Sequence, residues 1–129
     1  MSSVGAMTQT ATVVHVVGPE HTARAVGSGD LDVLGTPVVL AWLEEATCAE
    51  LDLDASQTSV GTRVEVQHLV ASAVGSTITT RATVTQRDGR MVIFDVSAHD
   101  QRGTLVASGQ VRRIVVDRER FLSRVPAVD

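Results

Sequence analysis

Two adjacent glutamates, Glu44 and Glu45, lie within a segment that is otherwise strongly apolar, residues 36–47 (TPVVLAWLEEAT). A helix that is apolar around most of its circumference has to be buried, and an ionised carboxylate there is costly unless it is paired, hydrogen-bonded or protonated. Successive helical residues point about 100° apart, so only one of the two can face inward. We therefore expect one carboxylate to have a partner or a chemical role. The alternative is that both are solvated acids at the border of the helix.

A histidine in a later segment is the second group that could take part in chemistry. In residues 64–69 (VEVQHL), alternation places His68 on the same apolar face as Val64 and Val66. A single histidine there is either a core residue with satisfied hydrogen bonds or a catalytic residue. The four histidines and one cysteine match no ligand spacing of a zinc site, and the chain has no nucleophile elbow, phosphate-binding glycine loop or dinucleotide fingerprint. We therefore expect no metal and no cofactor, and a site made of a carboxylate and an imidazole.

One helix and one strand have to position these groups. Thr36 and Pro37 form a favourable helix start, because a threonine side chain can cap free N–H groups and proline suits the first helical position. We expect this helix to reach about Leu51. Strands are expected where Val, Ile and Thr dominate, and the Asp88-Gly89 pair indicates a hairpin. The expected strands are 10–17, 60–71, 76–86, 90–99 and 104–116, with a loop at 20–35 and a short terminal helix at 118–125.

These elements predict an α+β fold in which one strand, one loop and one long helix precede an antiparallel meander of four strands. An apolar helix needs more cover than a flat sheet gives, so we expect a curved antiparallel sheet wrapped around one long central helix. A second copy of the chain would close the remaining exposed side and the sheet edge, which predicts a homodimer. The 129 residues fit one domain, which we place at 10–129 after a flexible N-terminus at 1–9.

Composition narrows the functional classes further. The net charge of −4 argues against a nucleic-acid-binding surface, and no stretch approaches the roughly 18 apolar residues that a membrane span requires. The single cysteine, Cys48, excludes an internal disulfide and fits a reducing compartment. We therefore expect a soluble cytoplasmic protein without nucleic-acid or membrane partners.

The order of elements, with a central helix that opens at Thr36-Pro37 and a long set of strands after it, resembles the hot-dog fold of acyl-CoA thioesterases. Within that superfamily the chain is most similar to the fluoroacetyl-CoA thioesterase-like family, over about residues 14–121. Each motif is short, so the order and spacing that the motifs have in common with this family are the stronger evidence for the resemblance. The positions that carry the resemblance are Thr36, Glu44, Gly61-Thr62, His68, Ser97-Ala98-His99-Asp100, Ser108-Gly109 and Arg113.

The resemblance implies a thioester hydrolase that cleaves an acyl-CoA to the free acid and CoA. It assigns Thr36, Glu44 and His68 as the catalytic set, and Gly61 and Arg113 as substrate-binding residues. A thioester carbonyl at the helix N-terminus would meet free N–H groups and the helix dipole, while Glu44 would act as general base or as nucleophile. The implied partners are an acyl-CoA and further copies of the chain, in a homodimer or a tetramer.

One departure from that family concerns specificity. The fluoroacetyl specialist has an aromatic lid before the threonine, and the roughly equivalent positions here are Gly27 and Asp30. We therefore expect a general or differently specialised acyl-CoA substrate. The hydratase and dehydratase branches of the superfamily fit less well, because the chain lacks their aspartate–histidine and His-Phe-Pro patterns. A non-catalytic acyl-CoA-binding dimer, in which Glu44 is only a buried hydrogen-bonded acid, is the alternative function.

Overall fold

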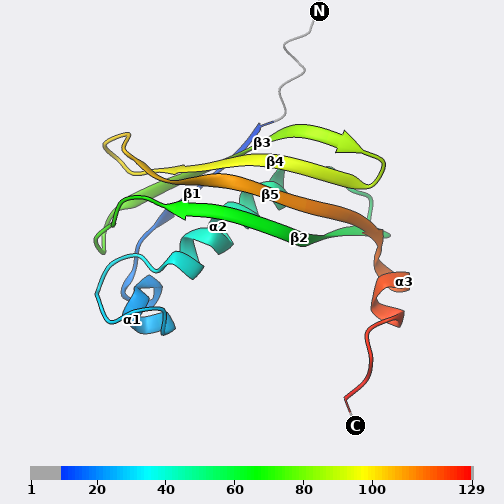
Figure 1. The fold of residues 1–129 in the computed structure, drawn as a ribbon, viewed down its shortest axis with the longest axis horizontal. Helices are drawn as coiled ribbons and strands as arrows, with labels where there is room; N and C mark the ends of the chain where they lie inside the picture. Colours follow the sequence, from blue (N-terminus) through cyan, green and yellow to red (C-terminus); the bar gives the residue numbers. More distant parts are fainter. Residues whose placement is uncertain (1–9, 129) are drawn as a thin grey trace, which may run out of the picture.

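A five-stranded antiparallel sheet curves around one long helix, α2, in the computed structural model of the chain (Figure 1). The structure describes residues 10–128, so the expected flexible N-terminus at 1–9 lies outside the described residues. The predicted α+β class is confirmed. The elements are β1 Thr10–Val16, η2 Pro19–His21, α1 Ala23–Val26, α2 Thr36–Glu50, β2 Gln57–His68, β3 Thr77–Asp88, β4 Met91–His99, β5 Leu105–Asp117 and α3 Arg118–Ser123.

The sheet has the strand order β1-β3-β4-β5-β2, and every neighbouring pair is antiparallel. The predicted meander of four strands is correct for β3, β4 and β5 and wrong for β2, which pairs with β5. The chain does not turn back after β2, because the amides of Leu69 and Val70 both bond to the carbonyl of Val106 in β5. Ala73 then forms a bridge with Val33. This connection carries the chain across the end of the sheet, so that β3 begins on the other side of β4.

The segment that we expect to be a loop, 20–35, contains the helix α1 and the end of η2. Thr22 caps α1 by accepting a bond from the amide of Ala25 (3.1 Å), and Gly27 ends the helix in the left-handed conformation (φ 78°). Four residues are too few to show an apolar periodicity. For this reason α1 is not evident from the sequence.

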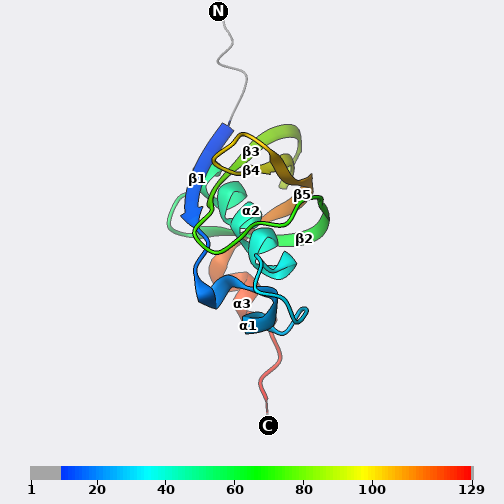
Figure 2. The ribbon, with the colours of Figure 1, turned by 90° about the vertical axis from the view of Figure 1, so that its left-hand side faces the viewer.

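Helix α2 lies on the inner side of the curved sheet (Figure 2) and buries one of its faces there. Its fully buried side chains include Val39, Leu43 and Ala46, which form one core cluster with Phe94 and Val111 of the sheet. This packing is the burial that the apolar helix requires. No helix within residues 10–128 combines the length and the apolar character needed to cross a membrane.

The face of α2 that points away from the sheet is uncovered in a single chain. Pro37, Ala41, Cys48 and Ala49 are exposed on it. The side chain of Glu45, 51% exposed, lies on the same face, so this face carries small side chains and one carboxylate.

Trp42, the only tryptophan of the chain, ties α2 to the strand β1. Its ring stacks on His15, with 4.5 Å between the ring centroids and 4° between the planes, and His21 meets it edge-on at 4.9 Å. His15 Nε2 also lies 2.6 Å from Glu45 Oε1. Aromatic pairs of this kind add about 0.5–1.5 kcal/mol beyond their buried area, so the cluster helps to fix the rotation of α2 against this edge strand.

Replacement of Gly109 by alanine tests the close pairing of β2 and β5. A Cβ at this position would lie 1.8 Å from the carbonyl oxygen of Glu65, which is backbone of β2 and cannot move without disturbing the ladder. We expect Gly109→Ala to lower the free energy of unfolding by about 1–3 kcal/mol, as overpacking does, measured by urea denaturation. Gln110→Ala, at the exposed neighbouring position, is the control, and equal stability of the two variants would contradict this description of the strand pair.

Candidate active site

Thr36 and His68 form a hydrogen-bonded pair where the start of α2 meets the end of β2. Thr36 Oγ1 lies 2.7 Å from His68 Nδ1. The expected role of Thr36 as helix cap is wrong, because Gly35 occupies the cap position and α2 has no side-chain cap. The Thr36 hydroxyl is thus available to the histidine, and we call these two residues the Thr36–His68 pair.

The surroundings of His68 favour the neutral imidazole. Burial lowers its pKa below the ordinary value of 6.5, and the nearby backbone of Val70 offsets part of this effect. Nδ1 faces the Thr36 hydroxyl, while Nε2 is buried and has no hydrogen-bond partner among the described residues. A neutral imidazole has one donor and one acceptor nitrogen, so the ring retains one nitrogen for a further partner.

Glu44 is the inward-facing member of the glutamate pair, and its partner is a buried arginine. Arg113, whose side chain is 8% exposed, places Nη1 3.4 Å from Glu44 Oε2. Its Nε donates to Ser59 Oγ (2.8 Å) and its Nη2 to the Ser59 carbonyl (3.2 Å). The Glu44 side chain is 32% exposed, whereas that of Glu45 is 51% exposed and contacts His15. The two acids therefore differ in surroundings, as the apolar helix requires.

Gly61 makes room for this ion pair. It lies opposite Arg113 in the β2–β5 ladder, next to an irregularity in register between Gly61 and Arg63. A Cβ on Gly61 would lie 2.7 Å from Glu44 Oε2 and 3.4 Å from Arg113 Nη1. The carboxylate thus occupies space that any other residue would fill. We call Glu44, Gly61, Arg113 and Ser59 the Glu44 cluster.

Within one chain the two groups of residues stay apart. Thr36 and Glu44 are eight residues apart on α2, about 12 Å along the helix axis, and Gly61 and His68 are seven residues apart on β2, roughly 23 Å along the strand. The structure therefore brings together Thr36 with His68, and Glu44 with Gly61 and Arg113, without joining the two sets. Within residues 10–128, no three His, Cys, Asp or Glu side chains are grouped so that they could hold a metal ion.

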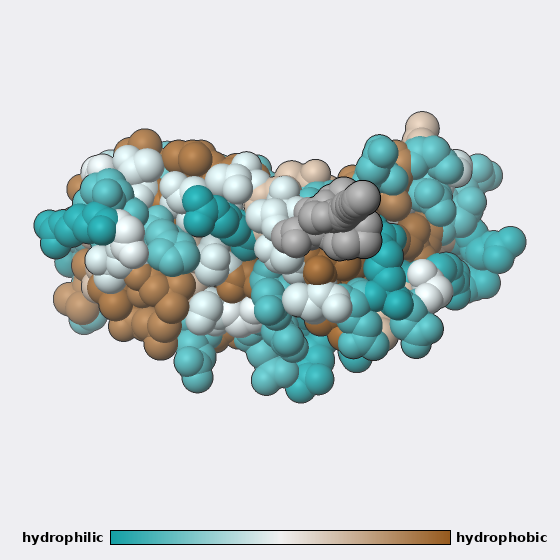
Figure 3. Space-filling model, turned by 90° about the horizontal axis from the view of Figure 1, so that it is seen from above, coloured by the Kyte–Doolittle hydropathy of each residue, from teal (hydrophilic) through white to brown (hydrophobic). Residues whose placement is uncertain are grey.

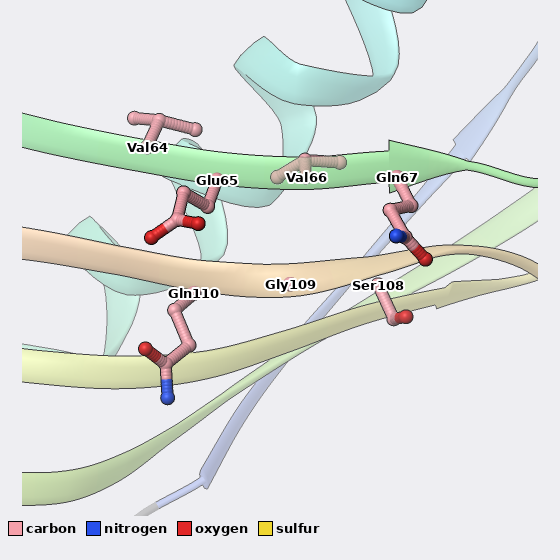
Figure 4. Close-up of a pocket in the computed structure, with 7 residues that line it drawn as sticks. All are labelled: Val64, Glu65, Val66, Gln67, Ser108, Gly109 and Gln110. Carbon is pink, nitrogen blue, oxygen red and sulfur yellow. The ribbon is translucent and has the colours of Figure 1, made fainter.

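Two hollows lie beside β2. The Thr36–His68 pair lines a pocket of about 250 Å³. A larger hollow of about 560 Å³ lies over β2 and β5, where Figure 4 shows Glu65 and Gln67 on β2 and Gln110 on β5. The larger hollow has none of the predicted site residues in its wall. The smaller pocket is therefore the one that adjoins the candidate chemistry.

Sequence reasoning identified Arg113 only as a substrate-binding residue, and it did not identify Ser59 or His15, which also support the two carboxylates. Ser59 lies two residues before Gly61 on β2, so strand alternation could have placed it on the same face. His15, the partner of Glu45, is 30 residues away in sequence, and no local pattern connects the two.

The lowered pKa of His68 predicts how stability depends on pH. The unfolded chain, with a histidine pKa near 6.5, binds a proton more readily than the folded protein does. The contribution of His68 is therefore fully present above pH 6.5 and is lost as the pH falls toward the folded-state pKa. We expect the wild type to lose more free energy of unfolding than His68→Gln between about pH 7.5 and pH 5.5, measured by urea denaturation. Equal losses in the two proteins would contradict this account of the imidazole.

Known proteins share parts of this sequence. A fluoroacetyl-CoA thioesterase of Streptantibioticus cattleyicolor is 34% identical over 73 residues. The matched region is 57% of this chain and 52% of the relative. The match therefore spans about half the length of that relative.

Two solved structures share the fold. A mutant of the fluoroacetyl-CoA-specific thioesterase FlK, in complex with fluoroacetate and CoA, matches with a TM-score of 0.83 at 28% identity, over 89% of this chain and 98% of that chain. A hot-dog-like protein from Thermanaerovibrio acidaminovorans matches with a TM-score of 0.80 at 25% identity, over 95% of this chain and 94% of that chain. The predicted hot-dog fold is confirmed.

A family model described as fluoroacetyl-CoA-specific thioesterase matches residues 17–119. This interval covers most of the chain and includes every residue of the Thr36–His68 pair and the Glu44 cluster. The resemblance inferred from the sequence is thereby confirmed. The chain belongs to the FlK family of fluoroacetyl-CoA-specific thioesterases.

Proposed function

We propose that the protein hydrolyses the thioester bond of an acyl-CoA and releases the free acid and CoA. Membership in a thioesterase family supports this reaction, as does the complex of a structural relative with fluoroacetate and CoA. The observation that carries the proposal is the placement of two polar clusters along one free strand edge. Glu44 is held beside Gly61 by a buried arginine, and Thr36 is bonded to His68.

Two copies of the chain would complete the site. β2 is an edge strand, and a long unpaired edge is a ready template for another strand. Val64 lies about midway between Gly61 and His68, so antiparallel pairing of two β2 strands about a two-fold axis near Val64 would bring His68 of the partner subunit close to Gly61. Each of the two equivalent sites would then combine the Glu44 cluster of one chain with the Thr36–His68 pair of the other.

The same arrangement would cover the exposed face of α2. Pro37, Ala41, Cys48 and Ala49 offer small side chains beside the exposed Glu45, which suits close packing against a second copy. We therefore propose a homodimer as the active form, since a single chain holds the two clusters too far apart for one substrate carbonyl.

In the proposed mechanism, the thioester carbonyl lies at the N-terminus of α2, where the Thr36 amide and the helix dipole stabilise the negative charge that develops on its oxygen. Glu44 takes a proton from a water molecule as this water attacks the carbonyl carbon. The carbon–sulfur bond then breaks, and the CoA sulfur leaves with the proton that Glu44 accepted. Direct attack by Glu44 would instead form a mixed anhydride, which water would then hydrolyse.

The remaining groups keep the reactants in place. Arg113 holds the Glu44 carboxylate, because its buried guanidinium is itself fixed by Ser59. The neutral His68 orients the Thr36 hydroxyl through Nδ1, while its buried Nε2 has no hydrogen-bond partner among the described residues. Arg113 is thus proposed as a positioning residue for Glu44, in addition to the contact with substrate that the family resemblance implies.

Substitution of the proposed general base and of the histidine that orients Thr36 tests the reaction. We expect Glu44→Gln, through loss of the general base, and His68→Ala, through loss of the orientation of Thr36, each to lower kcat by about a hundred-fold or more in steady-state assays with acyl-CoAs. Glu45→Gln, the same change at the adjacent exposed carboxylate, is the control and should retain activity. Equal rates for Glu44→Gln, His68→Ala and the wild type would remove these roles, and acyl-CoA binding without hydrolysis by the wild type would favour the non-catalytic alternative.

Mixed dimers test whether the site is shared between chains. Each variant lacks the residue that it would contribute to one of the two sites. In a dimer of one Glu44→Gln chain and one His68→Ala chain, both substitutions would fall in the same site, and the other site would be intact. Equal mixing after unfolding and refolding should therefore restore about a quarter of the wild-type activity, because half of the dimers are mixed and each has one working site of two. Failure to recover activity, with sedimentation showing mixed dimers, would place the whole site within one chain.

A further inference from the structure

Helix α3 has no buried residue in the single chain. It spans Arg118–Ser123, and its apolar side chains Phe121 and Leu122 are 39% and 62% exposed. The helix is attached only at its start, where the Arg118 guanidinium donates to the Gln57 carbonyl of β2 (3.2 Å). Isolated helices shorter than about 12 residues are marginal in water. A helix of six residues therefore gains from a surface on which its apolar side chains can pack.

A second uncovered apolar surface lies at the opposite end of β2. Leu69, Val70 and Val74, in the connection from β2 to β3, are each at least 40% exposed. Figure 1 shows this connection at the left of the molecule and α3 at the right, and Figure 3 shows apolar side chains gathered at the left-hand end. The 12 residues of β2 that separate the two surfaces span roughly 40 Å, so α3 does not reach this surface within its own chain.

Pairing of two β2 strands would bring these two surfaces together. In the proposed dimer the two-fold axis passes near Val64, and Gln57 precedes this residue by seven positions while Ala71 follows it by seven. Gln57 of one chain would therefore lie opposite Ala71 of the partner subunit. Figures 1 and 2 show α1 and α3 below the sheet, on the side that α2 occupies, and the connection after β2 lines one pocket with α1. In the dimer α3 would thus face this connection of the second copy instead of solvent.

The charges near these two surfaces are opposite in sign. Residues 117–124 contain three arginines and two acids, a net charge of +1, whereas residues 20–32, around α1, contain three acids and one arginine, a net charge of −2 with neutral histidine. Arg120 and Arg124 on the first segment and Asp30 on the second form no ion pair within residues 10–128. Complementary charge selects the partner and fixes the register of an interface. It therefore favours a second copy of this chain as the surface that α3 contacts.

We propose that Phe121 and Leu122 of α3 pack against Leu69 and Val70 of the partner subunit, once at each end of the paired β2 strands. The inference rests on the proposed homodimer and adds to it a contact outside the strand pairing. The two contacted residues line the pocket beside the Thr36–His68 pair. The α3 of one chain would therefore cover the same shared site to which that chain contributes its Glu44 cluster.

Pairs of cysteines test the contact in the full chain, with the native cysteine removed by Cys48→Ser. Phe121→Cys or Leu122→Cys is combined with Leu69→Cys or Val70→Cys in one chain. We expect at least one of the four combinations to form a covalent dimer on mild oxidation, seen on a non-reducing gel, because a disulfide requires Cα atoms within about 7 Å. The two positions lie at opposite ends of β2, so the bond forms only between copies. Leu122→Cys with Val14→Cys, on the edge strand β1, is the control and should not be cross-linked.

Sedimentation of the same proteins separates this inference from the proposed function. Dimers in which none of the four combinations forms a disulfide would overturn the contact and leave the shared site standing, whereas a monomeric wild type would remove both. Leu122→Ser should also raise the dimer dissociation constant by about a hundred-fold, about ten-fold for each of the two contacts. Val14→Ser, at a similarly exposed side chain, should leave it unchanged. Equal dissociation constants for Leu122→Ser and the wild type would contradict the contact.

Discussion

The burial of one face of α2 in the curve of the sheet is the interaction on which the rest of the structure depends. Val39, Leu43 and Ala46 are fully buried there, and a large aliphatic side chain that is removed from water contributes about 1.5–3 kcal/mol. The helix starts without a side-chain cap, so packing rather than capping fixes its position. With α2 placed in this way, Thr36 at its start bonds to His68 at the end of β2, and Glu44 in its middle lies beside Gly61.

A second constraint follows from placing an acid on such a helix. Glu44 is accommodated because a glycine leaves space for its carboxylate and a buried guanidinium lies beside it. The guanidinium in turn is held by hydrogen bonds to Ser59. The cluster therefore links α2 to β5 and β5 to β2. Removing Glu44 would leave the charge of the buried Arg113 uncompensated, which makes Glu44 difficult to replace on its own.

Much of this arrangement could be predicted from the sequence, for reasons that particular residues make clear. Alternation placed His68 with Val64 and Val66, and the structure has the latter two packed on the core. Periodicity defines faces but not neighbours, so it could not show that β2 pairs with β5 instead of β3. It also could not separate Glu44 from Glu45, because the arginine that distinguishes them lies 69 residues away. Thr36 was correctly placed at the helix start, but its hydroxyl bonds to an imidazole that only the tertiary fold brings near.

The ring cluster around Trp42 gives the protein an internal optical probe. The indole is the only one in the chain, and it is held between two imidazoles at the contact of α2 with β1. Its fluorescence therefore reports a single place in the molecule, without labelling. Any event that lifts the helix from this edge strand changes the environment of that one ring, so the docking of α2 can be followed separately from the pairing of β2 on the opposite edge of the sheet.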